Sequence, residues 1–563
     1  MLFETLERIH KETGIKLGHV NLGGGFPVNY LRDRMHSAEF PREQLEMFSA
    51  DFEPATAIGE AWKLVKNIAA DGGATDAHPA EHIAIYSRGR PTTYGTLREQ
   101  VAHVRGGLAA LGLAKGDRLV LLCGNGRYFV DLYLAALGLG VVVVPLNPAS
   151  PAPEIEREVK VVGAKVVVVE PLAAAAWHEV DRSHVPSVQH VVATEAGSVA
   201  ADSTFDELLA GPSTETVDVA ADELAVLIFT SGAAGSPRAA MLSHGNLLAN
   251  IEQATSTDGI VASDVVYGVL PMFHIFGLNV VLGMTLAGGA TVVLVQRFDP
   301  FTALETISER GVTVIPGAPP MWLAFCHFTE APADAFANVR LALTGSAKMP
   351  EEAMEGLQQH FRLTLREGYG LTEAAPIVTS SAGMPVKFGS VGKALAGMEV
   401  QLVDEHGEPA LHGDAGEVWV RGPNVFLGYL DEPEATARAL TPDGWLRTGD
   451  IAVTDDEGYL YLVDRAKDLI IVSGFNVYPA EVEEVLAEHA DVAEVGVVGV
   501  PHPHHGEAVK AFVVLKPGAA AHEDTLIAWC GEHLARYKCP SKIIFVDELP
   551  RNVSGKLLRR ELT

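Results

Sequence analysis

The chain of 563 residues is long enough for several domains, or for one large domain with an appendage, at roughly 100–200 residues per domain. Its hydrophobic content of 48% supports a sizeable core and argues against wholesale disorder. The 72 acidic residues outnumber the 42 Lys and Arg residues, and the net charge of -30 disfavours nucleic acid and anionic membranes as partners.

The cysteines and the amino-terminal residues indicate the compartment. The four cysteines form no CxxC pair, so they indicate neither a zinc site nor a disulfide framework, and we interpret them as free thiols in a reducing compartment. The first ten residues are charged and lack the apolar core of a signal peptide. No apolar run approaches the ~18 residues needed to span a bilayer. We therefore expect a cytoplasmic protein; peripheral membrane contact and a homodimer stay open.

Residues 1–54 do not fit the pattern of the rest of the chain and are predicted to be an N-terminal extension. Their glycine-rich segment Gly18–Val28 is similar to a segment of barrel-type pyridoxal-phosphate decarboxylases. Such a barrel needs about 200 residues or more, and fewer than 20 precede this segment. We interpret it as a decarboxylase-like remnant, a fusion scar or a coincidence, with no cofactor implied.

From about residue 80, short apolar strands alternate with stretches of helical spacing. Continuous valine runs are typical of strands buried on both faces, which predicts a parallel α/β sheet. Strands are expected at 118–122, 141–145, 165–169, 290–294 and 312–315, with helices at 128–139 and 153–162.

After residue 464 the elements form a smaller unit of about 100 residues. The predicted architecture is α/β: a large adenylation domain of parallel or mixed sheets with helices over 55–464, and a small, mobile α+β domain over 465–563. In the small domain, strands are expected at 469–472, 492–500 and 508–515, with helices at 479–489 and 523–534.

A turn rich in Ser, Gly and Pro at 230–237 follows a predicted buried strand at 225–229. Small residues in such a turn let backbone N–H groups approach phosphate oxygens closely. The glycine spacing fits neither a Walker A motif nor a dinucleotide fingerprint. The turn therefore predicts a phosphate-binding loop of another kind.

Five short motifs follow one another along the chain: Leu227–Arg238, Gly368–Glu373, Thr448–Asp450, Asp464–Asp468 and Asn552–Lys556. Together they resemble the acyl-adenylate-forming superfamily, and within it the AMP-forming acyl-CoA synthetases of the fatty-acid–CoA ligase type. The resemblance covers roughly residues 55 to 563.

The resemblance implies a two-step reaction. A carboxylic acid and MgATP give an acyl-adenylate and pyrophosphate, and attack by CoA then releases acyl-CoA and AMP. ATP and Mg²⁺ are the implied cofactors, with CoA as co-substrate and a small-molecule carboxylic acid as the second partner. The apolar segment Val314–Phe325 favours a medium- or long-chain fatty acid.

The resemblance also assigns the nucleotide site. Tyr369 stacks on adenine, Asp450 accepts hydrogen bonds from both ribose hydroxyls, and Arg465 partners it on the ribose or phosphate. Thr372 contacts the α-phosphate, and Glu373 holds Mg²⁺ together with Thr230. The full cofactor-binding set is Thr230, Ser231, Gly232, Gly235, Arg238, Gly345, Ser346, Tyr369, Asp450 and Arg465.

Further roles follow from the same resemblance. The catalytic residues that it implies are Lys556, Thr372 and Glu373. Of these, Lys556 bridges the acyl carboxylate and α-phosphate oxygens, where negative charge develops. Lys467 is the hinge about which the small domain rotates. CoA is assigned to Gly474, Phe475, Tyr537 and Lys538.

The acid is assigned to His274, Phe276, Gly345 and Ala347. His274 and Phe276 are the candidates for an acyl gate, although a lone histidine is more often structural. Relatives that activate amino acids place an Asp in the segment Pro271–Gly277 to hold the ammonium group. This segment has none, which favours a plain carboxylic acid.

The phosphate loop departs from the family pattern, because Ala233, Ala234 and Arg238 stand where relatives usually carry two Thr and a Lys. Two alternatives therefore stay open. One is an acyl-AMP ligase that loads a carrier-protein phosphopantetheine; the other is a non-catalytic acyl or nucleotide sensor. Retention of Glu373, Asp450 and Lys556 argues against the sensor, because a decayed enzyme need not keep all three.

Overall fold

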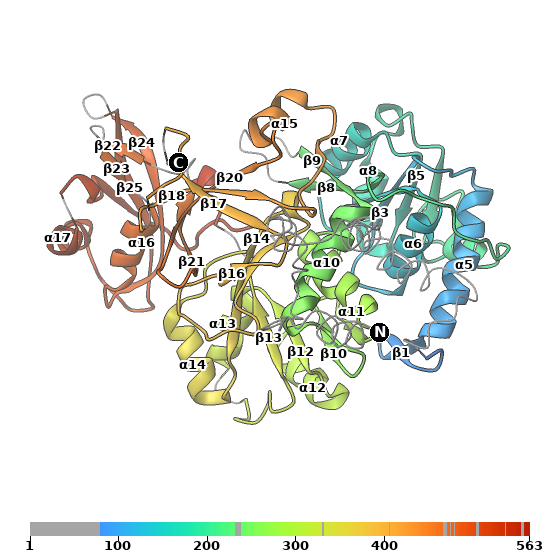
Figure 1. Cartoon of the computed structure of the whole chain (residues 1–563), viewed down its shortest axis with the longest axis horizontal. Helices are drawn as coiled ribbons and strands as arrows, with labels where there is room; N and C mark the ends of the chain where they lie inside the picture. Colours follow the sequence, from blue (N-terminus) through green and yellow to red (C-terminus); the bar gives the residue numbers. More distant parts are fainter. Residues whose placement is uncertain are drawn as a thin grey trace, which may run out of the picture.

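The computed structural model describes residues 79–562 apart from short gaps at 231–237, 329–330, 405, 412, 466–469, 473–474, 478, 503–505, 535 and 553–556. For some further residues, among them Arg465, Phe475 and Tyr537, only the backbone is described. The predicted extension at 1–54 lies outside the described residues. Figure 1 shows the described part with the carboxyl-terminal elements at the left and the first strands and helices at the right.

The valine runs form buried parallel strands, as predicted, and these strands lie at the centre of an eight-stranded sheet. Its middle strands are parallel and fully buried, because helices cover them, whereas the two strands at one edge run antiparallel. In spatial order the strands are β19 (Gly428–Tyr429), β9 (Arg238–Ser243), β8 (Leu224–Thr230), β4 (Val142–Pro145), β3 (Arg118–Leu122), β5 (Val166–Val169), β6 (His190–Ala193) and β7 (Ser203–Thr204). Helices α5 (Tyr94–Ala110), α6 (Arg127–Gly138) and α7 (Ala152–Val162) connect to these strands.

A nine-stranded sheet packs beside it and carries most of the candidate site. Six neighbouring strands are parallel, and antiparallel strands close both edges. In order these are β16 (Lys393–Ala394), β15 (Ile377–Ser380), β14 (Leu365–Gly370), β13 (Leu341–Thr344), β12 (Val314–Gly317), β10 (Val265–Gly268), β11 (Thr291–Leu294), β1 (Ile83–Ser87) and β2 (Arg90–Thr93). The associated helices include α10 (His244–Asp258), the π-helix η3 (Phe276–Gly283), α12 (Pro300–Arg310), α13 (Pro319–His327) and α14 (Glu351–Phe361).

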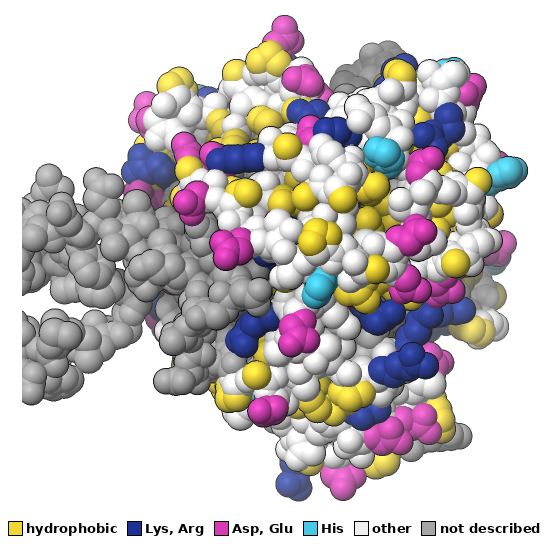
Figure 2. Space-filling model, turned by 90° about the vertical axis from the view of Figure 1, so that its right-hand side faces the viewer, with side chains coloured by type: hydrophobic (Ala, Val, Ile, Leu, Met, Phe, Trp, Pro, Cys, Tyr) yellow, Lys and Arg dark blue, Asp and Glu magenta, His cyan; other side chains and the backbone are white. Residues whose placement is uncertain are grey.

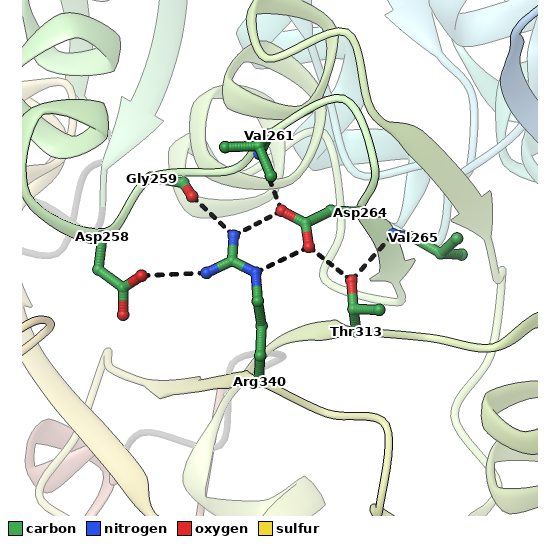
Figure 3. Close-up of polar contacts among 7 residues, drawn as sticks. All are labelled: Asp258, Gly259, Val261, Asp264, Val265, Thr313 and Arg340. Atoms are coloured by element: carbon green, nitrogen blue, oxygen red, sulfur yellow. Dashed lines mark hydrogen bonds and ion pairs between the residues drawn. The ribbon is translucent and has the colours of Figure 1, made fainter.

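An ion-pair network ties three of these parallel strands together at their amino ends (Figure 3). Asp264, Thr313 and Arg340 each stand immediately before a strand: β10, β12 and β13 respectively. The Arg340 Nε and Nη2 atoms donate to the two Asp264 oxygens at 2.8 and 2.5 Å, and the Thr313 hydroxyl donates to Asp264 at 2.7 Å. Burial alone would raise the pKa of Asp264, but the hydrogen bonds from Arg340, Val261 and Thr313 outweigh it, and the pKa is lowered.

A four-stranded antiparallel sheet links the two large sheets to the carboxyl-terminal part of the chain. One core cluster includes residues of all three, such as Leu121, Val292 and Val420, so they form one packed body. The strands are β17 (Glu399–Val403), β18 (Gly416–Arg421), β20 (Leu446–Thr454) and β21 (Leu460–Arg465).

The carboxyl-terminal elements form a separate α+β unit with its own core, in which Val482, Val509 and Leu526 are buried. The two predicted helices there are present, each ending one or two residues earlier than expected. The unit consists of β22 (Ile470–Val472), β23 (Phe475–Val477), α16 (Pro479–Ala487), β24 (Val492–His502), β25 (Gly506–Leu515), α17 (Glu523–His533) and β26 (Lys542–Phe545).

Basic side chains lie among acidic and apolar ones on the face in Figure 2, although acidic residues are in excess in the whole sequence. Within the described ranges, no helix combines the length and the apolar character that crossing a bilayer requires.

Candidate active site

The carboxyl ends of β13 and β14 lie side by side, with Thr344 opposite Glu367. In α/β sheets, ligands bind at this end of the strands. The loop after β13 begins with Gly345, where an added Cβ would stand 3.4 Å from the Gly368 carbonyl oxygen and 3.5 Å from the Phe276 ring. Three predicted site segments, from three different parts of the sequence, therefore meet here.

Ser346 follows with φ of 75°, in the left-handed region that residues other than glycine rarely adopt. Such strained residues cluster at ligand sites, where the surrounding structure enforces them. The strain at Ser346 therefore marks the same loop that the sequence assigned to adenine and the acid.

Tyr369 and Asp450 meet, although 81 positions separate them. The Tyr369 hydroxyl donates to Asp450 Oδ2 at 2.7 Å, and the two residues are only 7% and 8% exposed. On the neighbouring strand β21, Arg465 is the register partner of Asp450. The structure thus brings the predicted adenine and ribose residues together, with the backbone of Arg465 beside them.

A second group of predicted residues lies where the phosphate loop joins β9. Thr230 and Arg238 face each other in register on β8 and β9, one on each side of the loop. The strand β9 contacts the short helix η4 (Thr372–Ala374), which carries Thr372 and Glu373. The predicted phosphate-loop and metal residues are therefore neighbours in the fold.

Tyr429 connects this group. Its hydroxyl donates to Glu373 Oε1 at 2.7 Å, and the Arg238 guanidinium lies 5.6 Å from the centre of its ring. Arg238 Nε in turn donates to Glu432 Oε2 at 2.8 Å. Burial and the adjacent Glu373 carboxylate raise the pKa of Tyr429, so the phenol stays a protonated donor.

His274 and Phe276 open the π-helix η3. The backbone N–H of Phe276 donates to His274 Nδ1 at 3.2 Å, so the histidine ring helps to start the helix. The Phe276 ring packs against buried apolar residues of two core clusters. Phe276 is therefore suited to form an apolar wall of an acyl site. His274 has a structural role, because it accepts a hydrogen bond at the start of the helix.

The predicted CoA elements also meet one another. The strand β23, which carries Phe475, contacts the short helix η6 (Arg536–Lys538). In this arrangement the Lys538 ammonium is paired with both Glu481 oxygens, at 2.5 and 2.8 Å. An ion pair of 3.6 Å between Lys348, next to Ala347, and Glu484 on α16 joins this unit to the loop after β13.

The described part of the chain does not include all of the predicted site residues. Ser231, Gly232, Ala233, Ala234, Gly235, Lys467, Gly474 and Lys556 lie outside the described residues, as do the side chains of Arg465, Phe475 and Tyr537. Their roles stay predictions.

The sequence matches the family described as AMP-binding enzyme over residues 74–430, and the family described as AMP-binding enzyme C-terminal domain over residues 481–556. The chain belongs to the AMP-binding enzyme family.

Named relatives of this AMP-binding enzyme are CoA ligases or synthetases. The chain is 35% identical over 481 residues to feruloyl-CoA synthase of an Amycolatopsis species, covering 85% of this chain and 95% of that protein. It is 33% identical over 512 residues to the long-chain-fatty-acid–CoA ligase of Bacillus subtilis, covering 86% and 91%.

Its fold is similar to the crystal structure of ATP-bound MatB from Rhodopseudomonas palustris, with a TM-score of 0.81, 31% identity, and 89% and 97% of the two chains covered. The predicted family, fold class and enzyme class are confirmed: this AMP-binding enzyme is an AMP-forming acyl-CoA ligase.

Sequence reasoning missed several residues of the AMP-binding enzyme's site. Glu367 is 5% exposed; its Oε1 accepts from the Met349 N–H at 3.4 Å, while its Oε2 has no hydrogen-bond partner in the described part of the chain. Burial raises the pKa of Glu367 to about 7. The hydroxyl of Thr344, opposite it, is likewise buried without a partner among the described residues.

Asn125 was missed as well. Its amide donates to the Gly268 and Leu270 carbonyls, and its Oδ1 accepts from the Met272 N–H at 3.0 Å. It thus fixes the segment that leads to His274. The turn-forming sequence Gly124-Asn125-Gly126 after a predicted strand was the available signal for Asn125, but no sequence pattern indicates its partners.

Proposed function

We propose that this AMP-binding enzyme activates a medium- or long-chain fatty acid with ATP and Mg²⁺ and transfers the acyl group to CoA. The observation that carries the proposal is the junction of Tyr369 with Asp450, near the carboxyl ends of β13 and β14 where Gly345 and Phe276 meet. A nucleotide base, a ribose and an apolar acid would each find suitable groups there.

The nucleotide is held by an aromatic face and a carboxylate in this proposal. The hydroxyl of Tyr369 is anchored on Asp450, which fixes the ring as a platform for adenine. A carboxylate oxygen has two lone pairs, so Asp450 can accept from Tyr369 and still accept from ribose hydroxyls. Thr372 would then contact the α-phosphate in this proposal.

Glu373 and Thr230 would hold Mg²⁺. The donor set fits a hard cation, because Glu373 uses Oε1 for Tyr429 and receives no hydrogen bond on Oε2 from any described residue. Within the described ranges, no cluster of three or more His, Cys, Asp or Glu forms a protein-only metal cage. In the proposal the ion is held by one carboxylate and by substrate phosphates. When bound, Mg²⁺ neutralises negative charge on the phosphate oxygens.

The chemistry then needs positioning rather than a protein nucleophile. A carboxylate oxygen of the acid attacks the α-phosphorus of ATP, and the bond from that phosphorus to pyrophosphate breaks. Lys556 stabilises the charge that develops on the oxygens. The CoA sulfur next attacks the acyl carbonyl carbon, and AMP leaves with the carboxylate oxygen. Rotation of the small domain about Lys467 would exchange the groups needed for the two steps.

The apolar surroundings of Phe276 support a fatty acid. Phe276 packs against a cluster of buried apolar residues, which includes Ile251, Val280 and Val314. An aliphatic chain entering beside Phe276 would therefore exchange water for apolar neighbours, a transfer that favours binding.

A panel of carboxylic acids tests the proposal. Acids from C2 to C18, together with feruloyl and other aryl acids, are offered with MgATP and CoA, and both AMP and acyl-CoA are measured. We expect medium- and long-chain acids to give the highest kcat/KM. Faster turnover of the aryl acids would refute the fatty-acid assignment.

The same panel separates the two alternatives that the sequence left open. An acyl-AMP ligase for a carrier protein would release pyrophosphate and leave CoA unchanged, but would load a phosphopantetheinylated carrier protein. A sensor would bind ATP or the acid and release no pyrophosphate.

A further inference from the structure

Three hydrogen bonds from the segment 424–429 converge on the helix η4. Asn424 Nδ2 donates to the Ala374 carbonyl at 2.6 Å, and the Phe426 N–H donates to the Glu373 carbonyl at 2.9 Å. Both fix the backbone of the helix. The third bond, from the Tyr429 hydroxyl at 2.7 Å, reaches the Glu373 carboxylate itself and so fixes the rotation of that side chain.

Tyr429 is in turn fixed by its surroundings. Its backbone pairs with Ala240 on β9, and its ring lies edge-on to Phe426 at 4.9 Å. On the other side the Arg238 guanidinium approaches the ring and is paired with Glu432, three residues further along the same segment. A continuous set of contacts therefore runs from the residue after the phosphate loop, through Tyr429, to Glu373.

We propose that Tyr429 is a positioning residue, which orients the Glu373 carboxylate so that Oε2 faces a divalent cation, and that the Arg238–Glu432 ion pair holds the Tyr429 ring in place. The inference rests on the role of Glu373 in the proposed function. Partners of this kind, which contact a metal ligand rather than the metal, typically change metal affinity by about 10–100-fold when they are removed.

This arrangement accounts for an arginine at position 238, where a lysine was expected. The planar guanidinium can donate from Nε to Glu432 while it lies near an aromatic ring. A lysine ammonium is a compact point charge without this planar fork, so the arrangement suits arginine.

The test compares the binding of MgATP with that of metal-free ATP by isothermal titration calorimetry, with EDTA in the second case. We expect Tyr429→Phe, which keeps the ring and loses the hydroxyl, to raise the Kd for MgATP about tenfold. The Kd for metal-free ATP should change less than twofold. Glu373→Gln should show the same selective loss, and the double variant should lose no more than Glu373→Gln alone, because both changes remove one interaction.

Tyr94→Phe is the matched control, since it removes a buried phenol hydrogen bond to the Ala290 carbonyl at a site away from Glu373. It should leave both Kd values unchanged. Glu432→Ala is a second variant that keeps Tyr429 intact; we expect a smaller, equally metal-selective loss of about threefold.

Two results would overturn the inference: a Tyr429→Phe protein with the metal preference of the wild type, or an equal loss for MgATP and metal-free ATP. If Tyr429→Phe does not fold, an unselective effect of Glu432→Ala overturns it. Failure of the proposed function looks different, because a wild-type protein that prefers MgATP but releases no acyl-CoA would refute the function and leave the Tyr429 result intact.

Discussion

The two ends of the parallel strands of the nine-stranded sheet differ in how their polar groups are satisfied. At the amino ends, both Asp264 oxygens accept hydrogen bonds from Arg340 and from a neighbouring hydroxyl or N–H group (Figure 3). At the carboxyl ends, Thr344 and Glu367 each bury a polar atom that receives no hydrogen bond from the described residues, and Ser346 is strained. One end stabilises the fold, while the other buries polar groups that no described residue satisfies, at a cost in stability.

The amino end offers the largest expected effect on stability. Arg340→Ala would leave Asp264 buried without its cation, and breaking such a pair costs about 3 kcal/mol of unfolding free energy. We expect that loss in a denaturant titration, with the Kd for MgATP of the folded protein unchanged within twofold. A large change in Kd with unchanged stability would remove the distinction between the two ends.

Arg421→Ala is the matched control for that variant. Arg421 also forms a double contact with a carboxylate, Glu399, but their side chains are 39% and 58% exposed. Exposed pairs contribute at most about 1 kcal/mol, so this variant should be nearly as stable as the wild type.

The carboxyl end should respond to pH through Glu367. Burial raises the pKa of its carboxyl group from 4.5 to about 7, so between these values the folded state holds a proton that the unfolded state has lost. Stability therefore falls as pH rises through this window. Glu367→Gln mimics the protonated form and should be more stable than the wild type at pH 8 by about 2 kcal/mol, with no gain at pH 4. Thermal unfolding at the two pH values measures it; an equal gain at both would contradict the assignment.

Tyr369→Phe tests nucleotide binding at the carboxyl end of the strands. The variant keeps the ring that we propose stacks on adenine. It loses the hydrogen bond to Asp450, which as a bond to a charged group contributes roughly 1.5–3 kcal/mol. We expect the Kd for ATP to rise about tenfold. Unchanged ATP binding would mean that the Tyr369–Asp450 contact does not organise the nucleotide site.

Ser346→Gly has the smallest expected effect. Glycine adopts a φ of 75° without strain, so the variant should gain up to about 1 kcal/mol of stability. A more mobile loop should also weaken acid binding slightly. The melting temperature and the KM for the acid test the two halves; a loss of stability would show that the Ser346 side chain makes a contact more valuable than the strain it imposes.

The sequence predicted what depends on local pattern. Valine runs identified the buried strands, and five motifs identified the family, together with residues such as Tyr369 and Asp450 that the fold brings within hydrogen-bonding distance. It could not predict contacts that depend on the register of distant strands. Tyr429 reaches Glu373 only because β19 pairs with β9, and nothing near Tyr429 in the sequence indicates that pairing.

The π-helix at Phe276 could not be predicted from the sequence either. Its wider winding depends on tertiary packing around Phe276 and Asn279, whose amide donates to the Leu247 and Ala375 carbonyls. The same holds for Arg238: its charge was predicted to serve the phosphate loop, whereas its Nε contact with Glu432 spans 194 positions.

The contact between Lys348 and Glu484 has a consequence for the population of domain arrangements. These side chains are 62% and 68% exposed. An ion pair of that kind contributes at most about 1 kcal/mol, which is less than about 2RT. The pair alone therefore biases one arrangement of the small unit over another by only about fivefold, and less at high ionic strength. In the proposed rotation of the small unit, a ligand that prefers either arrangement tenfold would outweigh this ion pair.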